Sequence, residues 1–329
     1  MTTGADGTVR IWRASPDAEA IAAGNGFRVT DTDSSPDGRL LAAIADDGTA
    51  RIFDRDGGAE VRALPTDSET RGVALSYSPD GRSLAVAGED GVVRVWATSG
   101  RSPPTALPRD GAFRINGLAV HPSGPRIATA DDAGIVRVRG LEGSGGWTRV
   151  GRHEGPALAV AFDSGGQRIA SAGDDGTVRM WPASKTGSSI IGRHERGGQV
   201  NSVAFQPPDG KLLASGGDDG TVRLWDPQAR RSASVLRGHQ GLVLRVAFSS
   251  DGRMMASTGS DGTVRLWDVA ARQPFVVLRG HAGAVYDVTF VTSATRHDQP
   301  VLSSGDDGTI RLWRCTVCGP IDRVGVDAP

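Results

Sequence analysis

The segments Asp219-Gly-Thr-Val-Arg-Leu-Trp-Asp226 and Asp261-Gly-Thr-Val-Arg-Leu-Trp-Asp268 carry the same eight letters at two places in the chain. Complete or altered copies recur at intervals of 41 to 46 residues, with the aromatic position at Trp12, Phe53, Trp96, Arg139, Trp181, Trp225, Trp267 and Trp313. A unit repeated with this period cannot bury both of its faces alone, so neighbouring copies must stack against one another. The sequence therefore predicts a repeat protein.

Each repeat reads as a series of short strands, and residues 238 to 278 show this pattern clearly. Residues 243–248 are apolar enough for a strand buried on both faces, and further strands are expected at 254–258, 263–267 and, more weakly, 275–278. The Asp261-Gly262 pair is a strong hairpin signal, because glycine adopts positive φ without a Cβ clash. No ten-residue helical pattern interrupts the strands. Four short antiparallel strands per repeat predict an all-β chain made of β-propeller blades.

The Gly238-His239 opening, the Ser-Pro-Asp-Gly turns at 35–38 and 78–81, and the Trp267-Asp268 ending resemble those of the WD-repeat (WD40) β-propeller family. The resemblance covers nearly the whole chain and implies a seven-bladed β-propeller of four-stranded antiparallel blades. In that family a His before the first strand, a Ser or Thr in the second, an Asp in the turn and a Trp in the third form a hydrogen-bonded tetrad. The resemblance assigns four tetrads here: His153, Ser171, Asp175 and Trp181; His194, Ser215, Asp219 and Trp225; His239, Ser257, Asp261 and Trp267; His281, Ser303, Asp307 and Trp313.

The first three repeats depart from this pattern. No His precedes the strands near residues 30, 73 and 116, and the Ser positions are Ala43, Val86 and Thr129. The third of these repeats also has Ala133 for the turn Asp and Arg139 for the Trp. Losing a buried Trp costs about 3–5 kcal/mol unless the site adapts. We therefore expect four blades with complete tetrads and three that depend on apolar packing, one of them repacked around Arg139.

The chain begins inside a repeat, with strands expected at 2–4, 6–12 and 18–23. We predict one propeller domain over 1–329, in which 1–23 is a partial blade, 18–23 supply the outer strand of the last blade, and 314–329 are a tail. This arrangement removes the free edges of an open ring. The alternative is an eighth blade from residues 1–23 and 321–326. The start also suggests part of a longer chain, resembling propellers that end multidomain signalling proteins of bacteria, actinobacteria in particular.

Composition favours a cytoplasmic, soluble and monomeric protein. The net charge of −1 provides no general attraction to nucleic acids or anionic membranes. No apolar stretch approaches the ~20 residues of a membrane span, and the N-terminus has no signal region. Cys315 and Cys318 form an isolated C-x-x-C pair, whereas zinc would need a second pair of ligands. We therefore expect no metal, no cofactor, no nucleic-acid partner and no membrane partner.

Catalysis has little support in the sequence. The chain lacks the phosphate-loop, nucleophile-elbow and H-E-x-x-H motifs. The His, Asp and Ser set recurs at blade spacing, which indicates architecture, and the Arg repeated in the third strands is expected to form ion pairs between blades. An enzyme using the channel would need clustered ionisable residues from neighbouring inner strands, which mostly offer Val, Leu, Ala and Asn. We predict that the protein is not an enzyme.

The two ends of the predicted ring differ in charge. In a four-strand meander the turn after the second strand lies at the same end as the loop before the first. Ser260 precedes the turn Asp in one repeat, and acidic residues precede the turn Asp or its counterpart in the other six: Asp46, Glu89, Asp132, Asp174, Asp218 and Asp306. Basic residues follow the turn at the opposite end: Arg39, Arg82, Arg126, Arg168, Lys211 and Arg253. They are either ordinary turn and solubility residues, or a surface that orients a basic partner.

We predict a scaffold that binds a protein or peptide, of basic character, on the acidic end. The resemblance implies that residues at the start of each inner strand line this face together with the acidic residues: Thr30, Val73, Asn116, Leu158, Asn201, Leu244 and Tyr286. Tyr286 and the leucines would be apolar anchors and the carboxylates a polar rim. Two alternatives remain: an autoinhibitory cap on an upstream NTPase, kinase or regulator domain, and an enzyme with its active site at the channel mouth.

Overall fold

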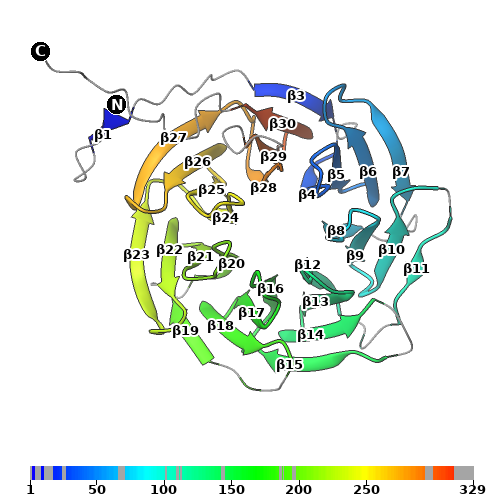
Figure 1. The fold of residues 1–329 in the computed structure, drawn as a ribbon, viewed down its shortest axis with the longest axis horizontal. Helices are drawn as coiled ribbons and strands as arrows, with labels where there is room; N and C mark the ends of the chain where they lie inside the picture. Colours follow the sequence, from blue (N-terminus) through cyan, green and yellow to red (C-terminus); the bar gives the residue numbers. More distant parts are fainter. Residues whose placement is uncertain are drawn as a thin grey trace, which may run out of the picture.

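Seven four-stranded antiparallel sheets form a closed ring (Figure 1). This computed structural model describes residues 27–65, 71–100, 102–108, 111, 113–141, 145–184, 187, 189–194, 198–292 and 299–314, and the backbone of three strands before residue 27. In these residues every regular element is a strand. The prediction of an all-β, seven-bladed propeller is confirmed, and the eight-bladed alternative is wrong.

Each blade runs from an inner strand at the channel to an outer strand at the rim. Blade 1 consists of β4 (Val29–Ser34), β5 (Leu40–Ala45), β6 (Thr49–Asp54) and β7 (Glu60–Pro65). Blade 2 consists of β8 (Gly72–Tyr77), β9 (Ser83–Gly88), β10 (Val93–Ala97) and β11 (Thr105–Ala106). Blade 3 consists of β12 (Ile115–Val120), β13 (Arg126–Asp131), β14 (Ile135–Gly140) and β15 (Thr148–Arg152). Blades 4 and 5 consist of β16 (Ala157–Phe162), β17 (Arg168–Gly173), β18 (Thr177–Pro182), β19 (Ser189–Arg193); β20 (Val200–Phe205), β21 (Leu213–Gly217), β22 (Thr221–Asp226), β23 (Arg231–Arg237). Blade 6 consists of β24 (Val243–Phe248), β25 (Met254–Gly259), β26 (Thr263–Asp268) and β27 (Gln273–Arg279).

Blade 7 joins the two ends of the chain. Its strands are β28 (Val285–Phe290), β29 (Val301–Gly305), β30 (Thr309–Trp313) and, from the N-terminal region, β3 (Ala18–Ala23). β3 pairs antiparallel with β30, from Ala18 opposite Trp313 to Ala23 opposite Thr309. Figure 1 shows β3 at the rim beside β30. β1 (Thr2–Thr3) and β2 (Val9–Arg10) pair only with each other, as a separate hairpin. The outer strand of the last blade therefore comes from the start of the chain.

A β-bulge lies at the second residue of every inner strand. In blade 6, Val243 pairs with Gly259 and Arg245 with Thr258, so Leu244 has no partner opposite it. The same shift recurs in all seven blades. A bulge redirects the extra side chain and bends the strand. The seven residues predicted to line the binding face occupy these bulge positions, and all of them are half-buried.

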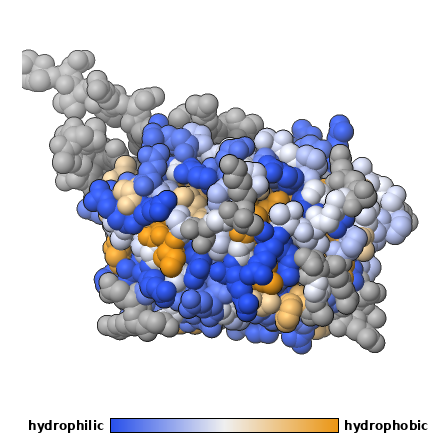
Figure 2. Space-filling model, turned by 90° about the horizontal axis from the view of Figure 1, so that it is seen from below, coloured by the Kyte–Doolittle hydropathy of each residue, from blue (hydrophilic) through white to orange (hydrophobic). Residues whose placement is uncertain are grey.

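The core lies between blades, where the third-strand Trp of one blade packs on the blade before it. Trp267 is 1% exposed and clusters with Leu224 and Leu236 of blade 5. Gly192 in β19 lies so close to Trp225 that an added Cβ would be 2.0 Å from its ring. The side of the ring below Figure 1 is mostly hydrophilic, with small separate hydrophobic areas (Figure 2). The apolar surface of the repeats is thus buried mainly at the blade-to-blade contacts.

This packing predicts that Gly192→Ala destabilises the protein by about 1–3 kcal/mol, because Trp225 must move to admit the methyl group. Gly146→Ala is the matched control, since an added Cβ there meets no atom within 4 Å. Its effect should stay within about 0.5 kcal/mol. Denaturant midpoints of the two variants provide the measurement. Equal midpoints would contradict the packing of Trp225 on the outer strand of blade 4.

Candidate functional site

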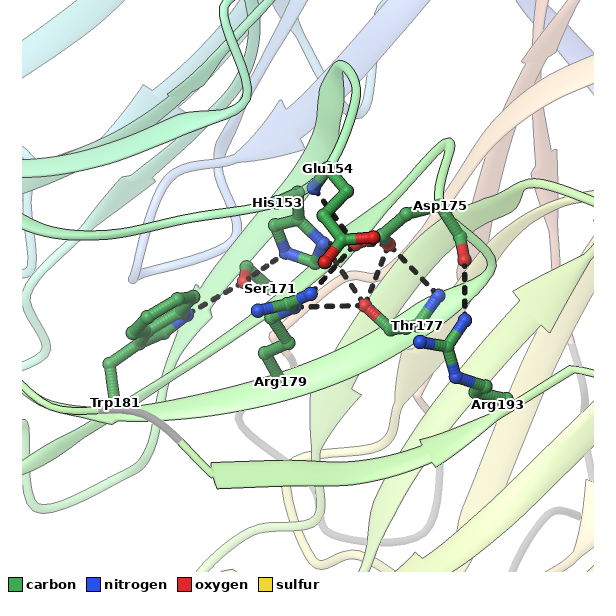
Figure 3. Close-up of polar contacts among 8 residues, drawn as sticks. All are labelled: His153, Glu154, Ser171, Asp175, Thr177, Arg179, Trp181 and Arg193. Atoms are coloured by element: carbon green, nitrogen blue, oxygen red, sulfur yellow. Dashed lines mark hydrogen bonds and ion pairs between the residues drawn. The ribbon is translucent and has the colours of Figure 1, made fainter.

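The four tetrads each form one chain of hydrogen bonds. In blade 4, Trp181 Nε1 donates to Ser171 Oγ at 2.7 Å, which lies 2.7 Å from His153 Nε2 (Figure 3). His153 Nδ1 lies 2.9 Å from Asp175 Oδ1. The tetrads that begin at His194, His239 and His281 repeat these contacts at 2.7 to 3.1 Å. The side chains named by the family resemblance therefore come together in blades 4 to 7.

A neutral imidazole satisfies every group in this chain of hydrogen bonds. The indole N–H donates to the Ser oxygen, the Ser hydroxyl can give its own hydrogen to His Nε2, and His Nδ1–H then donates to the Asp. Burial lowers the pKa of all four histidines, against the opposing effect of the Asp. Burial would raise the pKa of Asp219, but hydrogen bonds from Thr221 and His194 bring it to about 2. The tetrads thus hold neutral His beside ionised Asp.

A lowered pKa means that the unfolded chain binds more protons, so the tetrad contribution is lost as the pH falls. We expect the stability difference between the wild type and His194→Gln to be largest at pH 8. It should shrink below about pH 6.5, where an unfolded His becomes protonated. Raised pKa values of groups elsewhere are common to both proteins and cancel in the difference. Urea unfolding between pH 8 and 5 measures it, and a difference that grows towards acid would contradict the neutral tautomer.

A second, simpler contact also occurs in the blades that lack a tetrad. The strand Arg pairs with the turn Asp of its own blade, as Arg94 does with Asp90 at 2.9 Å and Arg179 with Asp175 at 3.0 Å. Arg51 pairs in the same way with Asp47. The expectation of ion pairs between blades is therefore wrong for five of these arginines: Arg51, Arg94, Arg179, Arg223 and Arg311. Their carboxylate partner lies four residues earlier in the same hairpin, well within reach of the guanidinium.

In blade 3, other residues take over the contacts missing at the two altered positions, Ala133 and Arg139. Asp131, two residues before Ala133, accepts from the backbone N–H of Ile135 at 2.9 Å and pairs with Arg137. Arg139 is 7% exposed, and its guanidinium carbon lies 6.0 Å from the ring centre of Trp147. An aromatic residue from just before β15 therefore covers the Arg that stands in place of the usual Trp. The blade has repacked without the lost indole.

The unequal blades predict unequal costs of mutation. Trp225→Ala should destabilise by about 3–5 kcal/mol, because it removes a buried aromatic ring and leaves Ser215 Oγ without its indole donor. Asp132→Ala should cost under about 1 kcal/mol, since this exposed side chain accepts one bond, from Asn116. Denaturant unfolding of both variants tests the difference. A Trp225→Ala midpoint as high as that of Asp132→Ala would rule out the tetrads as a main source of stability.

The end of the ring that carries the residues before each inner strand, the bulge residues and the residues before each turn Asp is called the top face. In every blade the backbone N–H of the residue before the turn Asp donates to the carbonyl of the residue before the inner strand, at 2.9 to 3.0 Å. Asp46 donates in this way to Arg28, and Ser260 to Leu242. The structure thus places the predicted acidic residues and the predicted strand-opening residues at one end.

Neighbouring side chains form hydrogen bonds or ion pairs with these carboxylates. Asn116 Nδ2 donates to Asp132 and Asn201 Nδ2 donates to Asp218, both at 2.8 Å. Arg28 Nε lies 2.6 Å from Asp46, and Arg114 lies 3.4 Å from Glu89. Asp174 accepts from Gln199, and Asp306 accepts from the hydroxyl of Tyr286. Arginines therefore compensate Asp46 and Glu89, whereas Asp132, Asp174 and Asp218 of blades 3 to 5 accept from neutral amides.

Three exposed apolar side chains on the top face were not predicted from the sequence. Of the five large hydrophobic residues found exposed in the described part of the chain, Phe27, Phe113 and Leu242 come one or two positions before an inner strand. Their exposed fractions are 46%, 51% and 40%. Tyr286, the predicted anchor, is instead half-buried and within hydrogen-bonding distance of Arg28, at 3.4 Å. A large apolar residue one or two positions before an inner strand, in three of the seven blades, was the signal that could have found them.

The opposite end, called the bottom face, carries pairs of opposite charge. Lys211 lies 2.6 Å from Asp209 and Arg168 lies 2.7 Å from Asp163. Arg39 and Arg253 each lie 3.9 Å from the carboxylate of their own turn. The basic residues predicted at this end are therefore largely balanced by the turn carboxylates beside them.

The inner strands of blades 6, 7 and 1 bring four ionisable residues together. Arg245 lies between two carboxylates, with Nε 2.8 Å from Asp287 and Nη2 3.2 Å from Asp31. Each carboxylate also accepts from the inner strand of the following blade: Asp287 from Thr32 N, Asp31 from Leu75 N, and Asp33 from Tyr77 N, at 2.7 to 2.9 Å. The expectation that the inner strands offer no ionisable cluster is wrong.

The sequence also led us to expect no metal site and no membrane-spanning segment. In the described residues there is no set of three or more side chains placed to hold a metal ion, and Cys315 and Cys318 lie outside those residues. The described part of the chain also contains no helix long and apolar enough to cross a membrane.

Six segments match the WD40 family, described as WD domain, G-beta repeat, at residues 20–54, 61–97, 148–182, 188–226, 230–268 and 272–314. The matches cover more than half of the chain, which therefore belongs to the WD40 repeat family. The unmatched stretch between 97 and 148 contains the repacked blade 3 with Arg139. A comparison with characterised proteins gave no significant match.

Proposed function

We propose that the protein is a non-enzymatic scaffold that binds a protein or peptide on its top face. The observation that carries this proposal is the exposure of Phe27, Phe113 and Leu242 at one end of the ring. They come from blades 1, 3 and 6, so they surround the channel rather than cluster at one seam. Exposed apolar groups among polar neighbours are typical of interaction surfaces, because a partner gains by removing them from water.

The charges of the top face favour a partner with basic residues. Asp132, Asp174 and Asp218 belong to three successive blades, and within the described residues their side-chain partners are the neutral amides of Asn116, Gln199 and Asn201. A basic segment lying over blades 3 to 5 would meet these carboxylates while an apolar residue reached Phe113. Electrostatic complementarity of this kind mainly sets the rate and specificity of association.

The family supports this class of function, since WD40 propellers are typically interaction scaffolds and the His, Ser and Asp side chains of the tetrads are committed to architecture. The same face could bind a partner in trans or cap a domain of the same polypeptide. The role in cytoplasmic bacterial signalling, and the NTPase, kinase or regulator domain that such a cap would cover, rest on the sequence resemblance alone.

The test uses peptides selected from a displayed random library against the whole protein. We expect the selected peptides to carry Lys or Arg beside an aromatic or aliphatic residue. Asp132→Asn, Asp174→Asn and Asp218→Asn together should slow association roughly tenfold at low ionic strength and flatten its salt dependence. Phe113→Ala should instead raise the dissociation rate, because it removes an anchor.

Two control variants, changed outside the top face, test whether the peptides bind to that face. Val61→Ala removes an apolar side chain that is 59% exposed on the outer strand β7, away from the top face. Asp37→Asn, Asp80→Asn and Asp251→Asn together remove three carboxylates from the bottom face. Surface plasmon resonance compares all four proteins. Peptides that respond to either control and ignore the top-face variants would move the binding surface elsewhere and overturn the proposal.

A further inference from the structure

The inner strands enclose a cavity of about 460 Å³ within the channel. Pro122, Ser164 and Pro207, which follow inner strands of blades 3, 4 and 5 at the bottom face, belong to its lining. The cavity therefore reaches the end of the ring opposite the top face. Its volume lies within the ~300–1,000 Å³ typical of small-molecule sites.

The cavity has two walls of different chemistry. Strands from blades 1, 2, 6 and 7 contribute polar side chains: Thr32, Asp33, Ser76, Arg245 and Thr289. With Asp163 and Ser164 after β16 as polar exceptions, blades 3 to 5 contribute mainly small and aromatic apolar side chains: Ala119, Ala161, Ala204, Phe162 and Phe205. A ligand that fills this space must be polar on one side and hydrocarbon on the other.

The polar wall carries an excess of negative charge. One guanidinium, Arg245, faces three carboxylates, and it already contacts two of them, Asp31 and Asp287. Two carboxylates line the cavity: Asp163 already pairs with Arg168, whereas Asp33 accepts from the backbone N–H groups of Ser34 and Tyr77. A carboxylate ligand would have to compete with Asp31 and Asp287 for Arg245, whereas a cation would meet Asp33 directly.

Burial raises the pKa of Asp33 to about 6, and the charge of Asp287 adds to the rise. Asp31, which shares the strand with Asp33, also has its pKa raised by burial, against the effect of Arg245. Burial raises the pKa of Tyr77, which packs against the same carboxylate from β8, so its hydroxyl stays neutral. The cluster therefore holds three carboxyl groups against one guanidinium, and a cation beside Asp33 would favour its ionised form.

Two buried hydroxyls beside the cluster add a separate observation. Thr258 pairs in register with Arg245, and Ser304 pairs with Asp287, so each shares a sheet face with a charged residue. Both hydroxyls are fully buried, and neither has a hydrogen-bond partner in the described part of the chain. Buried hydroxyls are normally hydrogen-bonded. Both belong to second strands and neither lines the cavity, so they lie behind the charged residues of the inner strands.

We infer that the channel cavity binds a small organic amine as its ammonium ion. The ammonium group lies against Asp33, where the hydroxyls of Thr32, Ser76 and Thr289 are available as further acceptors. The hydrocarbon part of the ligand packs on the alanines and phenylalanines of blades 3 to 5. This site is separate from the top face and does not depend on the proposed function, so the protein can hold the amine and a protein partner together.

Calorimetric titration of the whole protein with hexylammonium chloride, 1-hexanol and sodium hexanoate tests the inference. These probes share one hydrocarbon chain and differ in charge. Hexylammonium should bind one to one, hexanol at least tenfold more weakly, and hexanoate not detectably. Ammonium chloride, without a hydrocarbon part, should also bind at least tenfold more weakly. Preferred binding of hexanoate would assign the site to Arg245 and overturn the inference, and so would no binding of hexylammonium at millimolar concentration.

Variants locate the bound amine. Asp33→Asn keeps an oxygen acceptor for Tyr77 N and should weaken hexylammonium at least tenfold. Ala161→Leu on the apolar wall, which changes no charge, should weaken it to a similar degree by filling the cavity. Asp80→Asn, at an exposed bottom-face turn outside the lining, is the control and should change affinity less than twofold. Unchanged binding in both cavity variants would place the amine elsewhere and overturn the inference.

The pH dependence gives an independent readout. Hexylammonium affinity should fall below about pH 6 in the wild type, because protonation of Asp33 removes the charge that attracts the ligand. Asp33→Asn should flatten this decline. A decline of the same steepness in Asp33→Asn would assign the titration to another group and contradict the role of Asp33.

Discussion

Closure of the ring by the pairing of β3 with β30 is the constraint on which the rest of the structure depends. Each blade buries its two faces only against its neighbours, so an open ring would expose one face of blade 1 and one of blade 7. The pairing of β3 with β30 joins the two ends of the chain at the rim of the ring. At the channel, Asp287 of blade 7 accepts from Thr32 N and its hydroxyl in blade 1, so the two ends of the chain are joined at both radii.

This seam also explains where the charges of the channel lie. Asp31 and Asp33 of blade 1 and Asp287 of blade 7 lie at the closure, with Arg245 in the adjoining blade 6. Blades 3 and 4 present small apolar residues at the corresponding positions. Carboxylates accept backbone N–H groups from the next blade and so substitute for apolar contacts between inner strands. The arrangement makes one side of the channel polar, and that asymmetry is what allows the cavity to discriminate between cations and anions.

The blades reach similar geometry by different means. Blades 4 to 7 use the tetrad, in which a neutral His connects Ser and Asp while Trp donates to the Ser. Blades 1 to 3 retain only the ion pair between a turn carboxylate and the strand Arg. Because the bulge at the second inner-strand residue recurs in all seven, the top face remains regular despite this difference. The hydrogen bonds inside a blade can therefore differ between blades while the bulge residues keep their places on the top face.

The sequence by itself determined the period, the strand order within a blade, the closing strand and the end of the ring at which the acidic residues lie. These features follow from local spacing, since hairpin turns and two-residue alternation act over a few positions. Only the tertiary structure decided which groups meet across long separations. Arg245 reaches Asp31 from two blades away, and Asp287 accepts from the backbone N–H of Thr32 across the closure. Phe27, Phe113 and Leu242 are single apolar letters in polar loops, and only the ring shows that they share one face, because exposure depends on what packs nearby.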